Sequence, residues 1–221
     1  MSKNYIITID GPAASGKGAI SKILSKELNF YYLETGIYYR ILARKIKNNK
    51  IQKSDYKKYI LSLKTNNFDF SIKNREDLYK PEISKLSSFL AKEKIVREFI
   101  LERQRYLINN SSKKYKGILL EGRDCGTVIA PQADIKIYIT SDLNVRAKRR
   151  YDQYKAENKE ISFDDVYLDL SERDNRDKNR SISPLKKAED AVEINNTTDN
   201  LKETINIVKN IIFSKIPTLK N

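Results

Sequence analysis

An apolar, β-branched run at residues 5–9 leads directly into a glycine-rich segment, residues 11–18, and a helical pattern follows at once. The run is typical of a buried strand. Apolar residues from Ile20 to Leu28 recur at helical spacing, so a helix is expected to begin at residue 15 or 16 and to end at residue 28. The chain holds only seven Gly, and three of them lie within the eight residues of the segment. These features predict a strand, a tight loop and a helix at the start of the fold.

Further apolar runs alternate with amphipathic segments along the chain. Strands are expected at residues 30–33, 117–121, 135–139 and 191–194. Helices are expected at residues 39–47, 143–155, 163–180 and 201–212, with one long or interrupted helical region at 83–110. Strands that alternate with helices form parallel sheets covered on both faces. The predicted fold is therefore α/β, a parallel sheet with helices on both faces, and its ligands should lie beyond the carboxyl ends of the strands.

Residues 50–85 differ in character from the rest of the chain, because they are rich in Lys and Asn. Only Phe68, Phe70 and Ile72 alternate cleanly enough to predict a strand, which would be exposed. A small insertion that contains one short strand is expected here.

The composition excludes several chemistries. Among its 221 residues the chain has no His, no Trp and one Cys, Cys125. His-based triads and His-ligated metals are therefore excluded, and an internal disulfide cannot form. No run of 18 apolar residues occurs, and the first apolar run ends too early, at Asp10, for a signal peptide. We expect no membrane association, a cytoplasmic location and, because no segment is typical of an exposed apolar interface, a monomer.

The basic residues divide into two sets of different meaning. The formal net charge is +14, but 30 of the 43 basic residues are Lys spread along the whole chain, which indicates a general bias rather than a nucleic-acid site. The 13 Arg are more informative, because a planar guanidinium suits bidentate phosphate recognition. Seven of them lie within 58 residues: Arg123, Arg146, Arg149, Arg150, Arg173, Arg176 and Arg180. Their clustering predicts an anionic ligand.

The glycine-rich segment has the pattern of a triphosphate-binding loop, with Gly, four residues, Gly and Lys between a strand and a helix. Backbone N–H groups of such a loop converge on phosphate oxygens, the helix N-terminus adds partial positive charge, and the Lys reaches the terminal phosphates. The residues expected to bind ATP are Gly11, Pro12, Ala13, Ala14, Ser15, Gly16, Lys17, Gly18 and Ala19.

The loop departs from the usual pattern in one respect. Gly18 and Ala19 follow Lys17, so the hydroxyl that often holds Mg²⁺ is missing from both positions. We expect Mg²⁺ to be held by the phosphates and by water, with Asp10 or Ser15 in the outer shell and no direct protein ligand.

Three classes of triphosphate-binding protein compete at this point. A GTPase needs an Asn-Lys-x-Asp base reader and an Asp-x-x-Gly switch, and the chain contains neither. Helicase-type ATPases are usually longer. A small-molecule kinase must neutralise two anionic substrates held face to face, which requires arginines from several segments. Arg40, Arg97, Arg123 and the run between residues 146 and 180 supply them.

Four segments together resemble the bacterial-type cytidylate kinases, which are P-loop nucleoside monophosphate kinases. They are residues 9–17 (IDGPAASGK), 33–40 (LETGIYYR), 121–127 (EGRDCGT) and 172–180 (ERDNRDKNR). The resemblance extends over nearly the whole chain. It implies phosphoryl transfer from ATP to CMP or dCMP by a single kinase unit with three parts. These are a core at about 1–49, 86–150 and 181–221, a monophosphate-binding insertion at about 50–85 and a lid at about 151–180.

The resemblance also implies roles for individual residues. The acceptor nucleotide would be bound by Thr35, Tyr39, Arg40, Ser88, Arg97, Arg123, Asp124, Arg173, Asp177 and Arg180. Of these, Ser88 and Asp124 would meet the cytosine, and Arg173 and Asp177 the ribose. The catalytic charges would be Lys17, Arg123, Arg149 and Arg150, with Arg146 as a further lid arginine. Two features depart from the family: Glu34 stands where Asp is usual, and the insertion is short.

Catalysis would need no general base, because the second pKa of a phosphate monoester is about 6 and the acceptor phosphate is already ionised near neutral pH. Two alternatives stay open from the sequence. One is another small-molecule or nucleotide kinase that acts on UMP or AMP. The other is a basic ATP-binding protein that associates with RNA.

Overall fold

The computed structural model describes residues 4–65, 68–110, 114–198 and 200–220. The chain divides into two compact units, Met1–Glu34 with Ser111–Asn221, and Thr35–Asn110. The second unit is larger than the expected insertion at 50–85, and the expected lid belongs to the first unit. The assignment of binding and lid functions to these parts stays a prediction.

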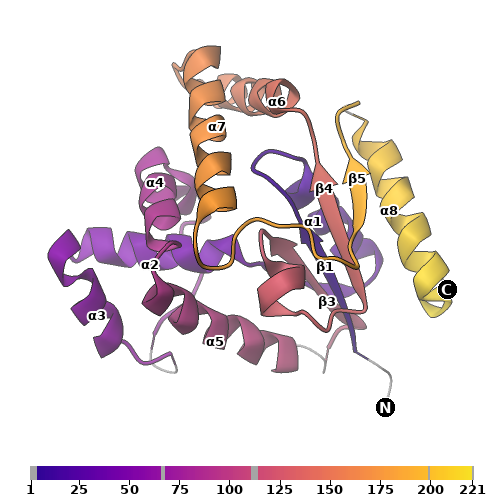
Figure 1. Cartoon of the computed structure of the whole chain (residues 1–221), viewed down its shortest axis with the longest axis horizontal. Helices are drawn as coiled ribbons and strands as arrows, with labels where there is room; N and C mark the ends of the chain where they lie inside the picture. Colours follow the sequence, from indigo (N-terminus) through magenta and orange to yellow (C-terminus); the bar gives the residue numbers. More distant parts are fainter. Residues whose placement is uncertain (1–3, 66–67, 111–113, 199, 221) are drawn as a thin grey trace. The chain divides into compact units, whose positions relative to one another are not determined.

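The first unit is built on a parallel sheet of five strands (Figure 1). The strands are β1 (Tyr5–Asp10), β2 (Phe30–Glu34), β3 (Gly117–Gly122), β4 (Ile135–Thr140) and β5 (Val192–Asn195). Their order is β2-β3-β1-β4-β5, and every neighbouring pair is parallel. The central strand β1 therefore lies between β3 and β4, at the point where the order reverses and where sheets of this type bind ligands. The strands predicted at 5–9, 30–33, 117–121, 135–139 and 191–194 and the predicted α/β fold are confirmed.

One face of the sheet carries the main apolar core of the first unit. Inward-facing Ile side chains of β1 and β4 pack with α1 (Lys17–Glu27) and α8 (Leu201–Lys215), which lies alongside β5 in Figure 1. Ile20 and Leu24 of α1 and Val208 and Ile212 of α8 have no exposed surface. The apolar positions that predicted these helices are the ones that they bury. On the other face, a π-helical turn, Cys125–Ile129, packs against β1.

Two helices, α6 (Leu143–Ala156) and α7 (Phe163–Asn179), form a separate small core with the tip of the glycine-rich loop. Ala13 of the loop packs with Ala147, Val166 and Leu170. Side-chain caps fix where the helices begin, because Asp142 accepts hydrogen bonds from the N–H groups of the first turn of α6 and Ser162 does so for α7. The expected helices at 143–155 and 163–180 are confirmed.

The second unit is helical. It contains α2 (Gly36–Asn48), α3 (Tyr56–Ser62), α4 (Pro81–Leu90) and α5 (Lys94–Asn110), with short 3₁₀ turns at Lys53–Asp55 and Arg75–Tyr79. The long helical region expected at 83–110 is thus two helices separated by a turn. Helix α2 begins three residues before the expected position, so Tyr39 and Arg40 lie close to its start.

The strand predicted from Phe68, Phe70 and Ile72 is wrong, since residues 68–73 form no strand. Phe68 and Phe70 are instead both buried against Phe99 of α5, with ring centroids 5.4 and 5.8 Å from it, and Ile72 is exposed. An aromatic cluster, not a ladder of backbone hydrogen bonds, accounts for the apolar spacing in this segment.

Candidate active site

The glycine-rich loop joins the carboxyl end of β1 to the N-terminus of α1, as predicted. Gly11 has φ +153°, and a Cβ there would lie 2.0 Å from the carbonyl oxygen of Ile139. Gly16, the residue before α1, has φ +88°. Only glycine adopts these conformations without strain or collision. The loop and the first turn of α1 therefore have the backbone form that collects N–H groups around an anion.

Lys17 lies at the centre of the site. Its Nζ donates to the carbonyl oxygen of Pro12 at 2.9 Å and lies 3.4 Å from Oε1 of Glu121. Burial, together with the positive charges of Arg123 and Arg173, lowers the pKa of Lys17 to about 8, against the opposing effect of Glu121. The amine is thus held over the loop in a cationic environment.

Glu121 is a site residue to which the sequence analysis gave no role. It lies on β3 opposite Ile9 of β1. The available signal was its position at the carboxyl end of a buried strand that neighbours the strand before the loop. Oε2 of Glu121 also accepts a hydrogen bond from the Tyr32 hydroxyl at 3.4 Å.

Asp10 binds the π-helical turn. Its two carboxylate oxygens accept hydrogen bonds from the N–H groups of Cys125 and Gly126, at 2.9 and 2.8 Å. Burial raises the pKa of Asp10 to about 6, although these two N–H groups oppose the shift and the nearby charge of Asp124 adds to it. Asp10 therefore fixes the turn that follows Arg123 relative to the end of β1.

Five of the predicted acceptor-binding residues lie together in the first unit: Arg123, Asp124, Arg173, Asp177 and Arg180. Nε of Arg123 contacts Oδ2 of Asp177 at 3.0 Å, and Arg180 lies 3.7 Å from both Asp177 and Asp124. Burial alone would raise the pKa of Asp177, but the charges of Arg123, Arg173 and Arg180 hold it below its usual value. Arg123, Arg173 and Arg180 thus surround an ionised carboxylate, whereas Arg176 pairs with Glu172 instead.

The three arginines predicted to belong to a lid have different surroundings. Arg146 is buried and donates to the carbonyl oxygens of Ser141 and Ala13 and, at 2.5 Å, to Oδ2 of Asp174. Arg149 donates to the carbonyl oxygen of Asn196 at 2.7 Å. Arg150 donates to Gln153 one turn along its own helix and lies over the ring of Tyr154. Of the three, Arg146 contacts the loop directly, and Arg149 contacts Asn196, which in turn contacts the loop.

The other predicted acceptor-binding residues belong to the second unit. Arg97 lies over the ring of Tyr39, with 5.6 Å from Cζ to the centroid, and the carbonyl oxygen of Thr35 accepts from Gln104. Arg40 donates to the carbonyl oxygen of Leu78 and to Ser84. The Ser88 hydroxyl is buried and has no hydrogen-bond partner among the described residues, so it fits a polar ligand group.

Protein ligands for a metal ion are few at the loop. The described residues contain no group of three or more Cys, Asp or Glu side chains that could hold one. The Ser15 hydroxyl is fully buried in the loop and has no hydrogen-bond partner in the described part of the chain. This single oxygen beside the N–H groups of the loop would fit a Mg²⁺ ion bound mainly by phosphates and water, the arrangement that Mg²⁺ prefers.

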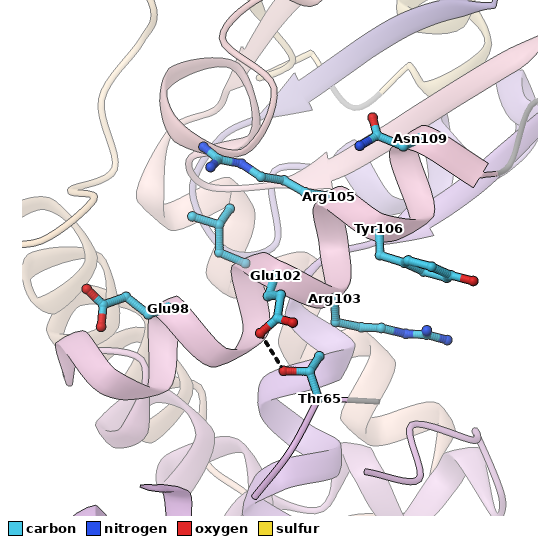
Figure 2. Close-up of a pocket in the computed structure, with 8 residues that line it drawn as sticks. Thr65, Glu98, Glu102, Arg103, Arg105, Tyr106 and Asn109 are labelled. Carbon is cyan, nitrogen blue, oxygen red and sulfur yellow. Dashed lines mark hydrogen bonds between the residues drawn. The ribbon is translucent and has the colours of Figure 1, made fainter. Parts of the chain in front are cut away.

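A hollow of about 740 Å³ lies along α5 in the second unit (Figure 2). Thr65 donates to Glu102 across it at 2.6 Å, and the Arg103 guanidinium lies 5.3 Å from the centre of the exposed Tyr106 ring. It contains none of the predicted site residues and mixes both signs of charge, so we assign it no part in binding the nucleotides.

Within the described residues, no helix is both long enough and apolar enough to cross a membrane.

Comparison with known proteins adds to this geometry. The family model described as "Cytidylate kinase" matches residues 7–214. A protein named cytidylate kinase from Fusobacterium nucleatum is 37% identical over 217 residues, which cover 93% of this chain and 95% of that one. Proteins of the same name from Rickettsia felis and Pseudothermotoga lettingae are 38% and 34% identical, with at least 94% of each chain covered.

Two solved structures support the fold. An uncharacterised protein from Eubacterium ventriosum matches with a TM-score of 0.52 at 14% identity, over 96% of this chain and 99% of that one. A protein described as a putative kinase from Chloroflexus aurantiacus matches with a TM-score of 0.50 at 10% identity, with 97% and 99% covered. At these identities the likeness concerns the fold alone.

Proposed function

Since the chain belongs to the cytidylate kinase family, it transfers a phosphoryl group from ATP to CMP or dCMP, and we propose that Lys17 and the arginines around Asp177 carry the transfer. The single observation that supports this assignment most strongly is the position of Lys17. It is buried over the phosphate-binding loop, within the electrostatic influence of Arg123 and Arg173. Positive charge is thus concentrated where two highly charged phosphate groups must meet.

The donor side of the reaction is the loop. N–H groups of residues 14–18 would bind the β- and γ-phosphates, and Lys17 would leave Glu121 and Pro12 for the phosphate oxygens. Bound Mg²⁺ would supply additional neutralisation of the phosphate charge. We propose that the phosphates and water hold Mg²⁺ and that the Ser15 hydroxyl or Asp10 lies in its outer shell.

The acceptor side is proposed to use both groups of predicted residues. Arg123, Asp124, Arg173, Asp177 and Arg180 would bind CMP from the first unit. The paired Arg123 and Asp177 favour this role, because the carboxylate holds the guanidinium in a fixed orientation.

In the second unit the residues proposed to bind the acceptor are Thr35, Tyr39, Arg40, Ser88 and Arg97. The buried Ser88 hydroxyl supports a contact with the cytosine, because such a group requires a partner.

The transfer itself would proceed by positioning and charge neutralisation. The CMP phosphate is ionised near neutral pH, so no side chain has to remove a proton. Lys17 and Arg123 would stabilise the charge that spreads over the transferred group. Arg149 and Arg150 are proposed to join them from α6. The hydrogen bond from Arg149 to Asn196, which contacts the loop, supports this role for Arg149. We also propose that the enzyme acts as a monomer in the cytoplasm, where the fully buried Cys125 stays reduced.

A coupled assay of ADP release tests the function directly. Purified enzyme should turn over CMP and dCMP at least tenfold faster, in kcat/KM, than UMP or AMP. Lys17→Ala and Arg123→Ala should each lower kcat by a few hundredfold, the loss typical of removing one preorganised charged group. A folded Lys17→Ala enzyme with unchanged kcat would refute the role of Lys17. A preference for UMP or AMP would refute the proposed acceptor site.

A further inference from the structure

Asn196 is a buried residue outside every motif described above. It follows β5 directly and is 3% exposed. Its side-chain Nδ2 donates to the carbonyl oxygen of Ser15 in the phosphate-binding loop at 2.9 Å. Its Oδ1 accepts from the Thr204 hydroxyl of α8 at 2.8 Å, and its backbone N–H donates to Thr140 at the end of β4 at 2.8 Å. Asn196 is thus fixed by the sheet and by α8, and it holds the loop.

The bond to Ser15 determines where the next N–H points. A trans peptide group is planar, and its C=O and N–H point in opposite directions. Because the Ser15 carbonyl is held toward Asn196, the Gly16 N–H of the same peptide group points away from Asn196. Gly16 is partly exposed and immediately precedes α1, so this N–H lies at the open side of the helix N-terminus, where phosphates bind.

The space around Gly16 depends on the same side chain. A Cβ on Gly16 would lie 2.5 Å from Nδ2 of Asn196, too close for the hydrogen bond to Ser15 to survive. Arg146 acts on the preceding part of the loop in a similar way, because it holds the Ala13 carbonyl from outside the motif. Donors from outside the loop therefore turn its carbonyl groups away from the ligand and its N–H groups toward it.

We infer that Asn196 is a positioning residue for the donor phosphates: by holding the Ser15 carbonyl, it aims the Gly16 N–H at them. The inference rests on the proposed role of the loop in binding ATP. Asn196 itself would not contact the phosphates. Its effect would reach the reaction through the orientation of one peptide group.

Asn196→Ala removes the donor without adding a charge. The KM for ATP should rise about 10- to 100-fold, because the Gly16 N–H would no longer donate to a charged phosphate and a hydrogen bond to a charged group is lost. The KM for CMP should change less than threefold. In ¹H–¹⁵N spectra, the Gly16 amide of the wild type should shift strongly when ADP is added, and this shift should be lost in the variant. With only seven Gly in the chain, the signal is simple to assign.

Thr204→Val is the matched control. It removes the other side-chain bond of Asn196 and leaves the donor to Ser15 in place. It should therefore lower the melting temperature while the KM for ATP changes less than threefold. A folded Asn196→Ala enzyme with a normal KM for ATP would overturn the inference, and so would an equal rise in the KM for CMP.

The spectrum of the wild type keeps the inference testable even if the Asn196 variant does not fold. If the chemical shift of the Gly16 amide does not change when ADP binds, the inference is overturned. A wild-type enzyme that binds neither ATP nor ADP would instead refute the function proposed for the loop.

Discussion

Lys17 has a pKa of about 8 in the free protein, mainly because it is buried, so its charge is lost within the range of ordinary assays. Bound ATP favours the protonated amine, and ATP binding should therefore take up a proton above pH 8. The dissociation constant for ATP should rise about tenfold between pH 7 and pH 9, where the γ-phosphate is already ionised. Isothermal titration calorimetry in two buffers of different ionisation enthalpy measures both the affinity and the proton uptake.

Lys17→Arg serves as the control, because an arginine stays charged throughout this range. Whatever its magnitude, the affinity of this variant for ATP should not depend on pH between 7 and 9. A wild-type affinity that is equally flat would contradict the shifted pKa.

Arg173 and Arg176 lie on the same helix, α7, and allow a paired comparison. The charge of Arg173 acts on both Lys17 and Asp177, whereas Arg176 pairs with the exposed Glu172 at 3.4 Å. Arg173→Ala should raise the KM for CMP about 10- to 100-fold with a smaller change in the KM for ATP. Arg176→Ala should leave both within twofold. Steady-state kinetics with each substrate varied in turn distinguishes these outcomes, and an effect of Arg173→Ala on ATP alone would contradict its assignment to the acceptor.

The site residues that could be predicted from the sequence are those that belong to a short, recognisable sequence pattern. Lys17 and the glycines belong to one short pattern next to a strand. Glu121 and Asn196, to which the sequence assigned no role, contact the lysine and the loop from 104 and 181 residues away. Arg146 was predicted as a lid arginine, but its hydrogen bond to Ala13, 133 residues away, was not. Nothing within a short window of sequence distinguishes such a partner from an ordinary buried polar residue.

Two helices and the loop are joined by one buried ion pair. Arg146 of α6 and Asp174 of α7 are 7% and 8% exposed, and both also bind the backbone of Ala13. Asp174→Ala leaves the Arg146 charge buried without its partner, which should lower the free energy of unfolding by about 3–5 kcal/mol. Asp152→Ala breaks the exposed pair with Lys148 on α6 and should change the free energy of unfolding little. Urea denaturation of the three proteins measures both effects, and similar losses in the two variants would contradict the importance of burial.

At the scale of elements, periodicity succeeded where apolar residues face one large surface. The five strands, α1 and α8 follow this rule, because one side of each is buried in the sheet core. It failed at Phe68 and Phe70, where a small helical unit buries aromatic rings from an irregular segment against α5. An alternating pattern of two rings indicates burial on a common side but does not distinguish a strand from a loop that packs on a helix.

For the whole molecule, the sequence predicted a parallel sheet but not its order. The place of β1 between β3 and β4 depends on pairings between strands more than 100 residues apart, which no local pattern records. The net charge of +14 is a second property of the whole chain, and it makes acid conditions destabilising through general repulsion. Any effect of a single group on stability must be separated from that background.

Asp10 provides such an effect, with the opposite sign. Burial raises its pKa in the folded protein from 3.8 to about 6, so between these values the folded chain keeps a proton that the unfolded chain has lost. The contribution of Asp10 to stability is therefore greatest below pH 4 and falls by about 3 kcal/mol as the pH rises to 6. Asp10→Asn lacks this titration but keeps the general repulsion. The free energy of unfolding of the wild type minus that of Asp10→Asn, from urea titrations at pH 4 and 6.5, should decrease by about 2 kcal/mol, because part of the full loss has already occurred at pH 4. A difference that increases with pH would show that the two backbone N–H groups outweigh burial and keep the folded-state pKa low.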